Sequence, residues 1–184
     1  MQVYGAADLG RAFRTVRKNT IQTAEEIPAD KYDFRPSADS RSVAETLKHI
    51  AVSTHWPLQL HGERTTHVSF DMFPKLMARL QQEEAELVTK DDIVKALASD
   101  GEEFANFLEA LTDEVLAEQV SFPPQANQPP KTRFEMLLSA KEHEMHHRAQ
   151  LMVAERMLGI VPHLTRQMQE RIAAMQQQKA AQGA

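Results

Sequence analysis

The strongest constraint on the fold is one long helical pattern between Thr132 and Gly159. The stretch Thr132-Arg-Phe-Glu135 has the capping-box form, in which a hydroxyl and a carboxylate satisfy free backbone donors reciprocally. Gly159 is typical of the position just past a helix C-terminus, and Pro162 follows shortly after it. The sequence therefore predicts a helix of about 26 residues here, the longest in the chain.

Apolar residues at helical spacing predict further helices along the chain. They cover Leu9–Ile27, a segment from Ser42 to the loop His61-Gly62 with a kink expected at Pro57, and a third region in two pieces, Pro74–Val88 and Asp91–Leu111. A second capping box is expected at Ser42–Glu45, and Tyr32 and Phe34 are expected to anchor the connection before it. The proline-rich loop Val120–Pro130 leaves room only for a short extended piece. No segment alternates with period two for long, so the class is all-α, with connections typical of a bundle.

Composition narrows the cellular context and the chemistry. With 184 residues and 42% hydrophobic side chains, one core is expected, and a formal charge of -5 gives no reason to expect nucleic acid or anionic membrane as partners. The start of the chain lacks a signal-peptide pattern and no apolar run is long enough to span a bilayer, so a cytoplasmic protein is expected. There are 8 histidines and no cysteine, which leaves imidazole and carboxylate as the metal ligands.

Two of the histidines lie on a core-facing stripe of the longest helix. Met136, Ala140, His143, His147, Leu151, Ala154 and Leu158 follow one another at spacings of three or four residues. Residues four apart bring their Cβ atoms within about 5 to 6 Å, so His143 and His147 can direct nitrogens at one ion. The alternative is that both are ordinary polar residues at the edge of the core, each bonded to a carbonyl or carboxylate. Spacing alone leaves these two interpretations evenly balanced.

A third ligand has to come from another helix, and His49 is the best candidate. It lies in the body of the second helix, on a flank shared with Thr46, Ser53 and Trp56. The other histidines are expected at the surface, because they fall near helix ends or in loops, or point away from the stripes; they are His55, His61, His67, His146 and His163.

The string His143-Glu144-Met145-His146-His147 also matches HExxH, the zinc motif in which the glutamate is a general base. The extended metzincin form fails, because Gln150 and Val153 stand where glycine and histidine are needed. A downstream glutamate ligand could be Glu170, in a segment with little apolar support. The protease interpretation is therefore disfavoured. A role of Glu144 as a base beside the ion stays open as an alternative, and an exposed glutamate is favoured.

Several stretches together resemble the DinB family, the DinB/YfiT-like metalloenzymes. They are Ile27-Pro28 through Tyr32, Arg35-Pro36, Ser42 to His49, His143 to Gln150 and the closing Leu158 to Pro162. The resemblance implies a four-helix bundle of the up-down-down-up type over residues 1–164, frequently a homodimer. Residues 165–184 would then form an extra C-terminal helix or tail, partly disordered. It also implies one divalent ion bound by His49, His143 and His147.

The resemblance implies one fold but several possible activities. Some relatives are metal-dependent transferases that use a small thiol, so the expectation is a hydrolase or transferase in which a thiol or water is activated at the three-histidine site. Zinc or nickel is expected first, then iron or manganese, with a small thiol and an electrophile as reactants. No catalytic side chain is assigned. The alternative is a non-catalytic, stress-related or partner-binding bundle that the ion stabilises.

Overall fold

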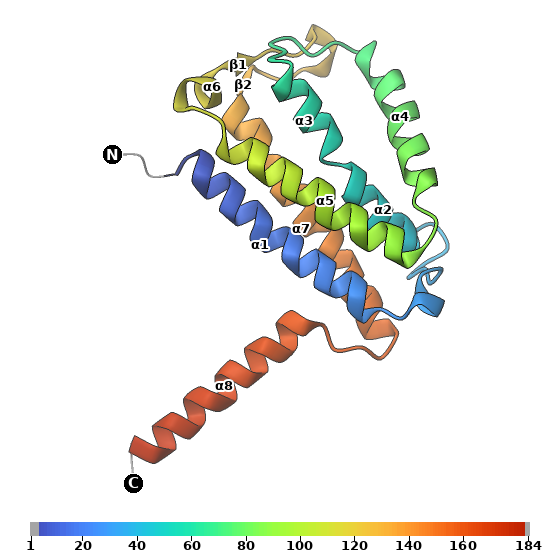
Figure 1. Ribbon diagram of the computed structural model, residues 1–184, viewed down its shortest axis with the longest axis vertical. Helices are drawn as coiled ribbons and strands as arrows, with labels where there is room; N and C mark the ends of the chain where they lie inside the picture. Colours follow the sequence, from blue (N-terminus) through green and yellow to red (C-terminus); the bar gives the residue numbers. More distant parts are fainter. Residues whose placement is uncertain (1–3, 183–184) are drawn as a thin grey trace.

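Four helices pack side by side around the core of this protein. The computed structural model describes residues 4–182. The bundle helices are α1 (Ala6–Glu26), α2 (Val43–Val52), α5 (Lys90–Glu109) and α7 (Arg133–Met157). Both α1 and α2 pack against α5 and against α7, which closes the four into a ring. In Figure 1, α1 and α7 run down the view, whereas α2 and α5 run up it.

The remaining elements extend one end and one side of the bundle. Helix α3 (His55–Gly62) continues from α2, and α4 (Met72–Glu86) returns along α2 (Figure 1). Helix α6 (Asp113–Ala117), which the sequence pattern did not predict, precedes a small antiparallel pair of strands, β1 (Gln119–Val120) and β2 (Lys131–Thr132). Short 3-10 turns span Ala29–Lys31 and Pro124–Ala126. Strands of two residues leave the predicted all-α class intact.

Helix starts agree closely with the capping patterns of the sequence. The Ser42 hydroxyl accepts from the Glu45 amide at 3.1 Å, and the Glu45 carboxylate accepts from the Ser42 amide at 2.9 Å. At the start of α7 only half of the predicted box forms, since the Thr132 hydroxyl accepts from the Glu135 amide. The Glu135 side chain instead lies 3.8 Å from the ammonium of Lys131. The long helix therefore begins where predicted, with one reciprocal hydrogen bond fewer.

The expected kink at Pro57 is a complete break placed upstream of it. Helix α2 ends at Val52 and α3 begins at His55, so Pro57 occupies the first turn of α3. Proline has no amide hydrogen to donate to a carbonyl four residues earlier, so one continuous helix would lose that bond. In the first turn of a helix this donor is unused in any case. Helix α3 runs on toward the end of the bundle where the β strands lie (Figure 1).

The connection between α1 and α2 is pinned by aromatic anchors, as expected. Tyr32 is buried, and its hydroxyl donates to the Ala24 carbonyl at 2.8 Å. Phe34 is partly buried against the same apolar cluster, which includes Leu47 and Ile50 of α2. These contacts hold the start of α2, and with it His49, in register with the bundle.

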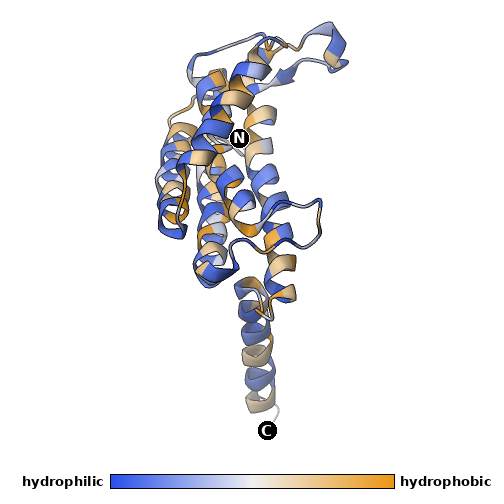
Figure 2. Cartoon of the chain, turned by 90° about the vertical axis from the view of Figure 1, so that its right-hand side faces the viewer, coloured by the Kyte–Doolittle hydropathy of each residue, from blue (hydrophilic) through white to orange (hydrophobic). Residues whose placement is uncertain are grey.

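Helix α8 (His163–Gln182) projects away from the bundle (Figures 1 and 2). Its first turn is attached, because His163 is buried and Arg166 pairs with Glu26 at 2.6 Å. Farther along, the apolar side chains Met168, Ile172 and Met175 are exposed. The expected domain boundary at 164 stays a prediction, and residues 1–3 and 183–184 of the two expected domains lie outside the described residues. No helix within residues 4–182 is long and apolar enough to cross a membrane.

The junction of α1, α7 and α8 buries several polar atoms that have no hydrogen-bond partner among the described residues. They include both carboxylate oxygens of Glu155, one oxygen of Glu26 and Nδ1 of His163. Glu155 is fully buried, and its burial, followed by the nearby Glu26 carboxylate, raises the pKa of Glu155 to about 7. Ionised Glu155 is therefore disfavoured in the folded protein.

Substituting Glu155→Gln is expected to remove a pH dependence of stability. Because the folded-state pKa exceeds the unfolded value, the carboxyl stabilises the fold fully below about pH 4.5 and loses that contribution as the pH rises through about 7. The variant should therefore gain about 1–3 kcal/mol in unfolding free energy relative to wild type at pH 8, and little at pH 4. Urea unfolding at both pH values measures this. The exposed Glu142 on the same helix provides the control E142Q, and equal curves for E155Q and wild type would contradict the expectation.

Candidate metal centre

The three predicted ligands converge on one point between α2 and α7. The Nε2 atom of His143 lies 3.2 Å from Nε2 of His49 and 3.2 Å from Nε2 of His147. One ligand nitrogen from each of the three side chains lies within 4.8 Å of the other two. The spacing of His143 and His147 on α7 and the capped start of α2 bring this about. Sequence reasoning therefore selected three side chains that the fold does gather.

Hydrogen bonds on the far side of two rings orient the lone pairs. Nδ1 of His49 donates to the Glu84 carboxylate at 3.2 Å, and Nδ1 of His147 donates to the Gln150 side-chain oxygen at 2.9 Å. A neutral imidazole that donates through Nδ1 has an unprotonated Nε2. The lone pairs of His49 and His147 thus face the centre of the triad, each 3.2 Å from Nε2 of His143. His143 has at most one Nε2 hydrogen to donate, so without a cation it can satisfy only one of them. This arrangement fits a cation site better than a set of satisfied core histidines.

Electrostatics keep the triad neutral at physiological pH. Burial, then the charge of Arg41, lowers the pKa of His49 to about 4. Burial, then the neighbouring imidazoles, lowers the pKa of His143 to about 4, and burial also lowers the pKa of His147. Neutral imidazole is the form that binds metal ions, so these shifts remove proton competition near pH 7.

The donor set fits a divalent transition metal. Tetrahedral zinc with nitrogens at about 2.0–2.1 Å requires neighbouring nitrogens about 3.4 Å apart, close to the observed 3.2 Å. Three imidazoles suit zinc, nickel, copper or iron, and thiolate ligands are excluded because the sequence has no cysteine. Three protein ligands also leave coordination positions open, as in catalytic rather than structural sites.

Glu144, expected at the surface, is buried instead. Its side chain is 1% exposed, and both carboxylate oxygens accept from Nε of Arg17, at 3.1 and 3.0 Å. The same guanidinium donates to the carbonyls of Leu97 and Ile50, so the pair joins α1 and α7 to α5 and α2. Gly101 makes room for it, since a Cβ there would lie 2.6 Å from Cγ of Arg17. The pair fixes the rotation of α7 and so directs His143 and His147 toward α2.

The buried ion pair also removes the basis of the protease interpretation. In HExxH enzymes the glutamate faces the ion as a base, whereas Glu144 faces the bundle interior and is neutralised by Arg17. Glu170 lies exposed on α8, far along the sequence from the triad. Glu144 is therefore a positioning residue of the bundle.

The five remaining histidines divide between surface and interior. His67 and His146 are exposed, as expected, and His55 is half-buried between the carboxylates of Glu83 and Asp100. The expectation was wrong for His61 and His163, which are each 1% exposed. His61 lies under Arg133, with 3.1 Å between Nδ1 of His61 and Nη1 of Arg133, and Nε2 of His163 lies 3.3 Å from the Asn19 side-chain oxygen. Tertiary neighbours cover both helix ends, and a helical periodicity cannot reveal such neighbours.

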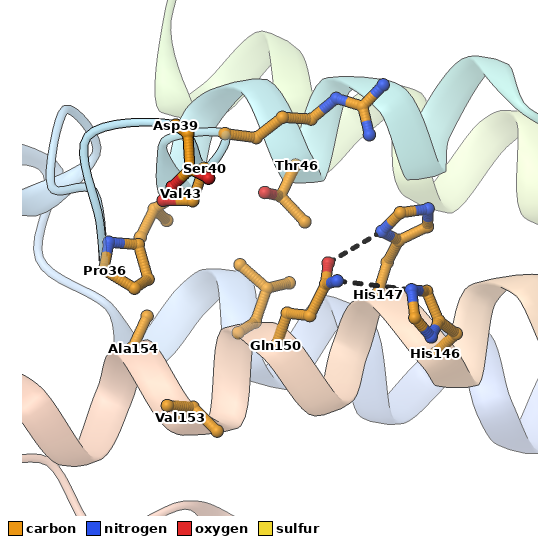
Figure 3. A pocket seen from close by; sticks show the side chains of 12 residues that line it. Pro36, Asp39, Ser40, Val43, Thr46, His146, His147, Gln150, Val153 and Ala154 are labelled. Carbon is orange, nitrogen blue, oxygen red and sulfur yellow. Dashed lines mark hydrogen bonds between the residues drawn. The ribbon is translucent and has the colours of Figure 1, made fainter.

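Two clefts border the triad. The Arg41 cleft, of about 720 Å³, includes His147 in its wall, and its other polar lining residues include Asp39, Ser40, Arg41, Thr46 and Gln150. In Figure 3, Gln150 lies beside His147, whereas Asp39 and Ser40 lie at the other end of the cleft. The Trp56 cleft, of about 450 Å³, includes His49 and His143 and has an apolar wall that contains Trp56, Phe73, Leu80, Phe122 and Met136. The triad thus lies between two clefts, of which the Arg41 cleft has the larger share of polar side chains in its wall.

Comparison with known proteins identifies the family of this chain. The family model described as the DinB superfamily matches residues 12–151. The chain belongs to the DinB superfamily. YjoA of Bacillus subtilis is 28% identical over 147 residues, which cover 80% of this chain and 86% of YjoA.

Solved structures of DinB proteins share the fold. The crystal structure of the DinB-like protein YjoA superposes with a TM-score of 0.61 over 83% of this chain and 92% of YjoA, at 28% identity. A DinB-family protein from Exiguobacterium sibiricum gives 0.60 over 84% and 91% of the two chains, at 23% identity. YfiT of Bacillus subtilis, described as a probable metal-dependent hydrolase with an unusual four-helix bundle topology, gives 0.65 over 84% and 88%, at 17% identity. These likenesses confirm the predicted four-helix bundle.

Replacing Glu84 with glutamine is expected to weaken metal binding by about 10- to 100-fold, because the carboxylate that orients His49 and raises its basicity is lost. The exposed Glu86, two residues further along α4, provides the matched control E86Q. Competition titration of both variants against a chromogenic zinc chelator measures the dissociation constants. If E84Q bound zinc as tightly as E86Q, the hydrogen bond of 3.2 Å between His49 and Glu84 would have no part in the site.

Proposed function

We propose that this DinB protein is a metal-dependent enzyme that activates a small nucleophile, water or a thiol, for attack on an electrophile in the Trp56 cleft. The observation that carries the proposal is the convergence of three imidazoles between two clefts, with Nε2 of His143 lying 3.2 Å from Nε2 of His49 and of His147. A divalent ion held by His49, His143 and His147 would lower the pKa of a water or thiol that it binds. Zinc or nickel fits the donor set best.

In this proposal the side chains around the ion orient its histidine ligands and shield the electrophile from bulk water, and none of them acts as an acid or base. Glu84 and Gln150 hold the rings of His49 and His147. The apolar wall around Trp56 would bury the body of the electrophile against His49 and His143. Glu144 takes no part, since Arg17 neutralises it inside the bundle.

The test compares metal-loaded and metal-free protein, purified without a histidine tag. Each form is assayed with water and a panel of small thiols against a bimane or halogenated-arene electrophile, and with a chromogenic ester for hydrolysis. We expect turnover in the zinc- or nickel-loaded protein, none in the metal-free protein, and loss in H143A. His67 is exposed and lies outside the triad, so H67A should retain the activity.

Equal rates in the loaded and metal-free forms would contradict the proposal. If metal removal then lowered the melting temperature without any activity to lose, the ion would serve a non-catalytic, structural bundle instead.

A further inference from the structure

Arg41 is a cation in the wall of the Arg41 cleft that forms no salt bridge with a carboxylate among residues 4–182. Its side chain forms no ion pair or hydrogen bond within the part of the chain that the structure describes. The neighbouring Arg35, in contrast, pairs with the Glu45 carboxylate and donates to the Ser40 carbonyl at 2.7 Å. Exposed arginines without a partner are common in proteins. A binding role for Arg41 is therefore argued from its position relative to the triad.

Arg41 and the triad share one cleft. The side chain of Arg41 lies in the wall of the cleft whose wall also includes His147. A molecule in this cleft can therefore contact Arg41 and approach the centre of the triad at the same time.

Other polar groups of this cleft are engaged within the protein. Gln150 bridges His147 and His146 (Figure 3), with 3.2 Å between its nitrogen and Nε2 of His146. The Thr46 hydroxyl donates to the Ser42 carbonyl at 2.8 Å. Asp39 supplies a carboxylate to the wall, and it accepts from the Ser37 hydroxyl at 2.7 Å. Arg41 is left as the group able to recognise a charged ligand.

We propose that the Arg41 cleft binds a small anionic reactant, whose carboxylate or phosphate pairs with Arg41 while its nucleophilic atom reaches the three-histidine centre beside His147. This inference rests on the proposed function. It assigns the two clefts to two reactants: the hydrophilic, anionic nucleophile enters on the Arg41 side, and the apolar electrophile occupies the Trp56 side. A group transfer between two substrates would use both clefts. Hydrolysis would use only the Trp56 cleft for the substrate, because water is then the nucleophile.

The test uses cobalt(II)-loaded full-length protein, because a thiolate bound to cobalt(II) gives a charge-transfer absorption that reports binding without turnover. The probes are 3-mercaptopropionate, which is anionic, and 3-mercapto-1-propanol, which is neutral and similar in size. We expect wild type to bind the anionic thiol about tenfold more tightly than the neutral one. In R41Q this preference should vanish, while R35Q, with its arginine already paired, should keep it.

The outcomes separate this inference from the function on which it rests. If cobalt(II) binds and both thiols bind equally well in wild type, or if R41Q keeps the preference, the anionic site is refuted and the metal-dependent function stands. If the protein fails to bind cobalt(II), both proposals are overturned. Retention of neutral-thiol affinity in R41Q shows that the variant is folded and its metal site intact.

Discussion

Substituting Glu144→Ala is expected to lower the free energy of unfolding by about 3–5 kcal/mol. The variant leaves the Arg17 guanidinium buried without its counter-ion, since the two side chains are 3% and 1% exposed. The hydrogen bonds from Arg17 to the carbonyls of Leu97 and Ile50 satisfy part of the guanidinium but leave its charge uncompensated. Chemical denaturation of the metal-free protein measures the loss without a contribution from a bound ion.

Two further variants isolate the cause. E142A removes an exposed carboxylate from the same helix and should change stability by less than about 0.5 kcal/mol. The double variant R17M/E144L replaces the ion pair with apolar side chains of similar volume and should recover most of the loss. A cost below about 1 kcal/mol for E144A would show that the pair does not hold the bundle together.

Substituting His143→Ala is expected to weaken divalent-metal binding by at least 100-fold. His143 is the middle donor, and its Nε2 lies 3.2 Å from the corresponding atom of each other ligand. Two histidines alone bind an ion weakly. Because the fold holds all three ligands in place before the ion binds, removal of one ligand should strongly lower the affinity of the site for the ion. The stabilisation by metal, about 2.7 kcal/mol at a hundredfold excess over the dissociation constant, should disappear with it. Calorimetric titration and thermal unfolding, each with and without zinc, measure both effects.

His146 provides a control on the same helix, because it is exposed and is not one of the three gathered ligands; its ring contacts His147 and its Nε2 lies beside the Gln150 nitrogen. H146A should bind zinc within a few-fold of wild type. Equal affinities of H143A and wild type would mean that the ion, if any, binds elsewhere.

Local signals in the sequence predicted much of the fold. The capping box at Ser42 and the helical spacing on α7 depend on residues three or four positions apart, and the structure places both as expected. The positions of His49, His143 and His147 follow from the same local regularity plus the family resemblance. Helix α6 is not predicted from the sequence, because its five residues are too few to show a helical periodicity of apolar side chains.

The charged interior could not be predicted in the same way. Glu144 was assigned to the surface because glutamate usually lies there, and its partner Arg17 is 127 positions away in the sequence. The burial of His61 depends likewise on Arg133, and that of His163 on Asn19. A weak signal was present for the ion pair, because Arg17 falls four residues after the apolar Phe13, on the core-facing side of α1. Pairs of this kind are set by tertiary packing, which a pattern within one helix does not encode.

The most direct test of the metal centre is a crystal structure of the untagged protein grown with zinc, with anomalous difference density recorded at the zinc absorption edge. We expect one peak between α2 and α7, about 2.0–2.1 Å from Nε2 of each of His49, His143 and His147. Density at this point that lacks an anomalous signal, or a zinc peak held by other side chains while these three imidazoles bond only to the protein, would contradict it.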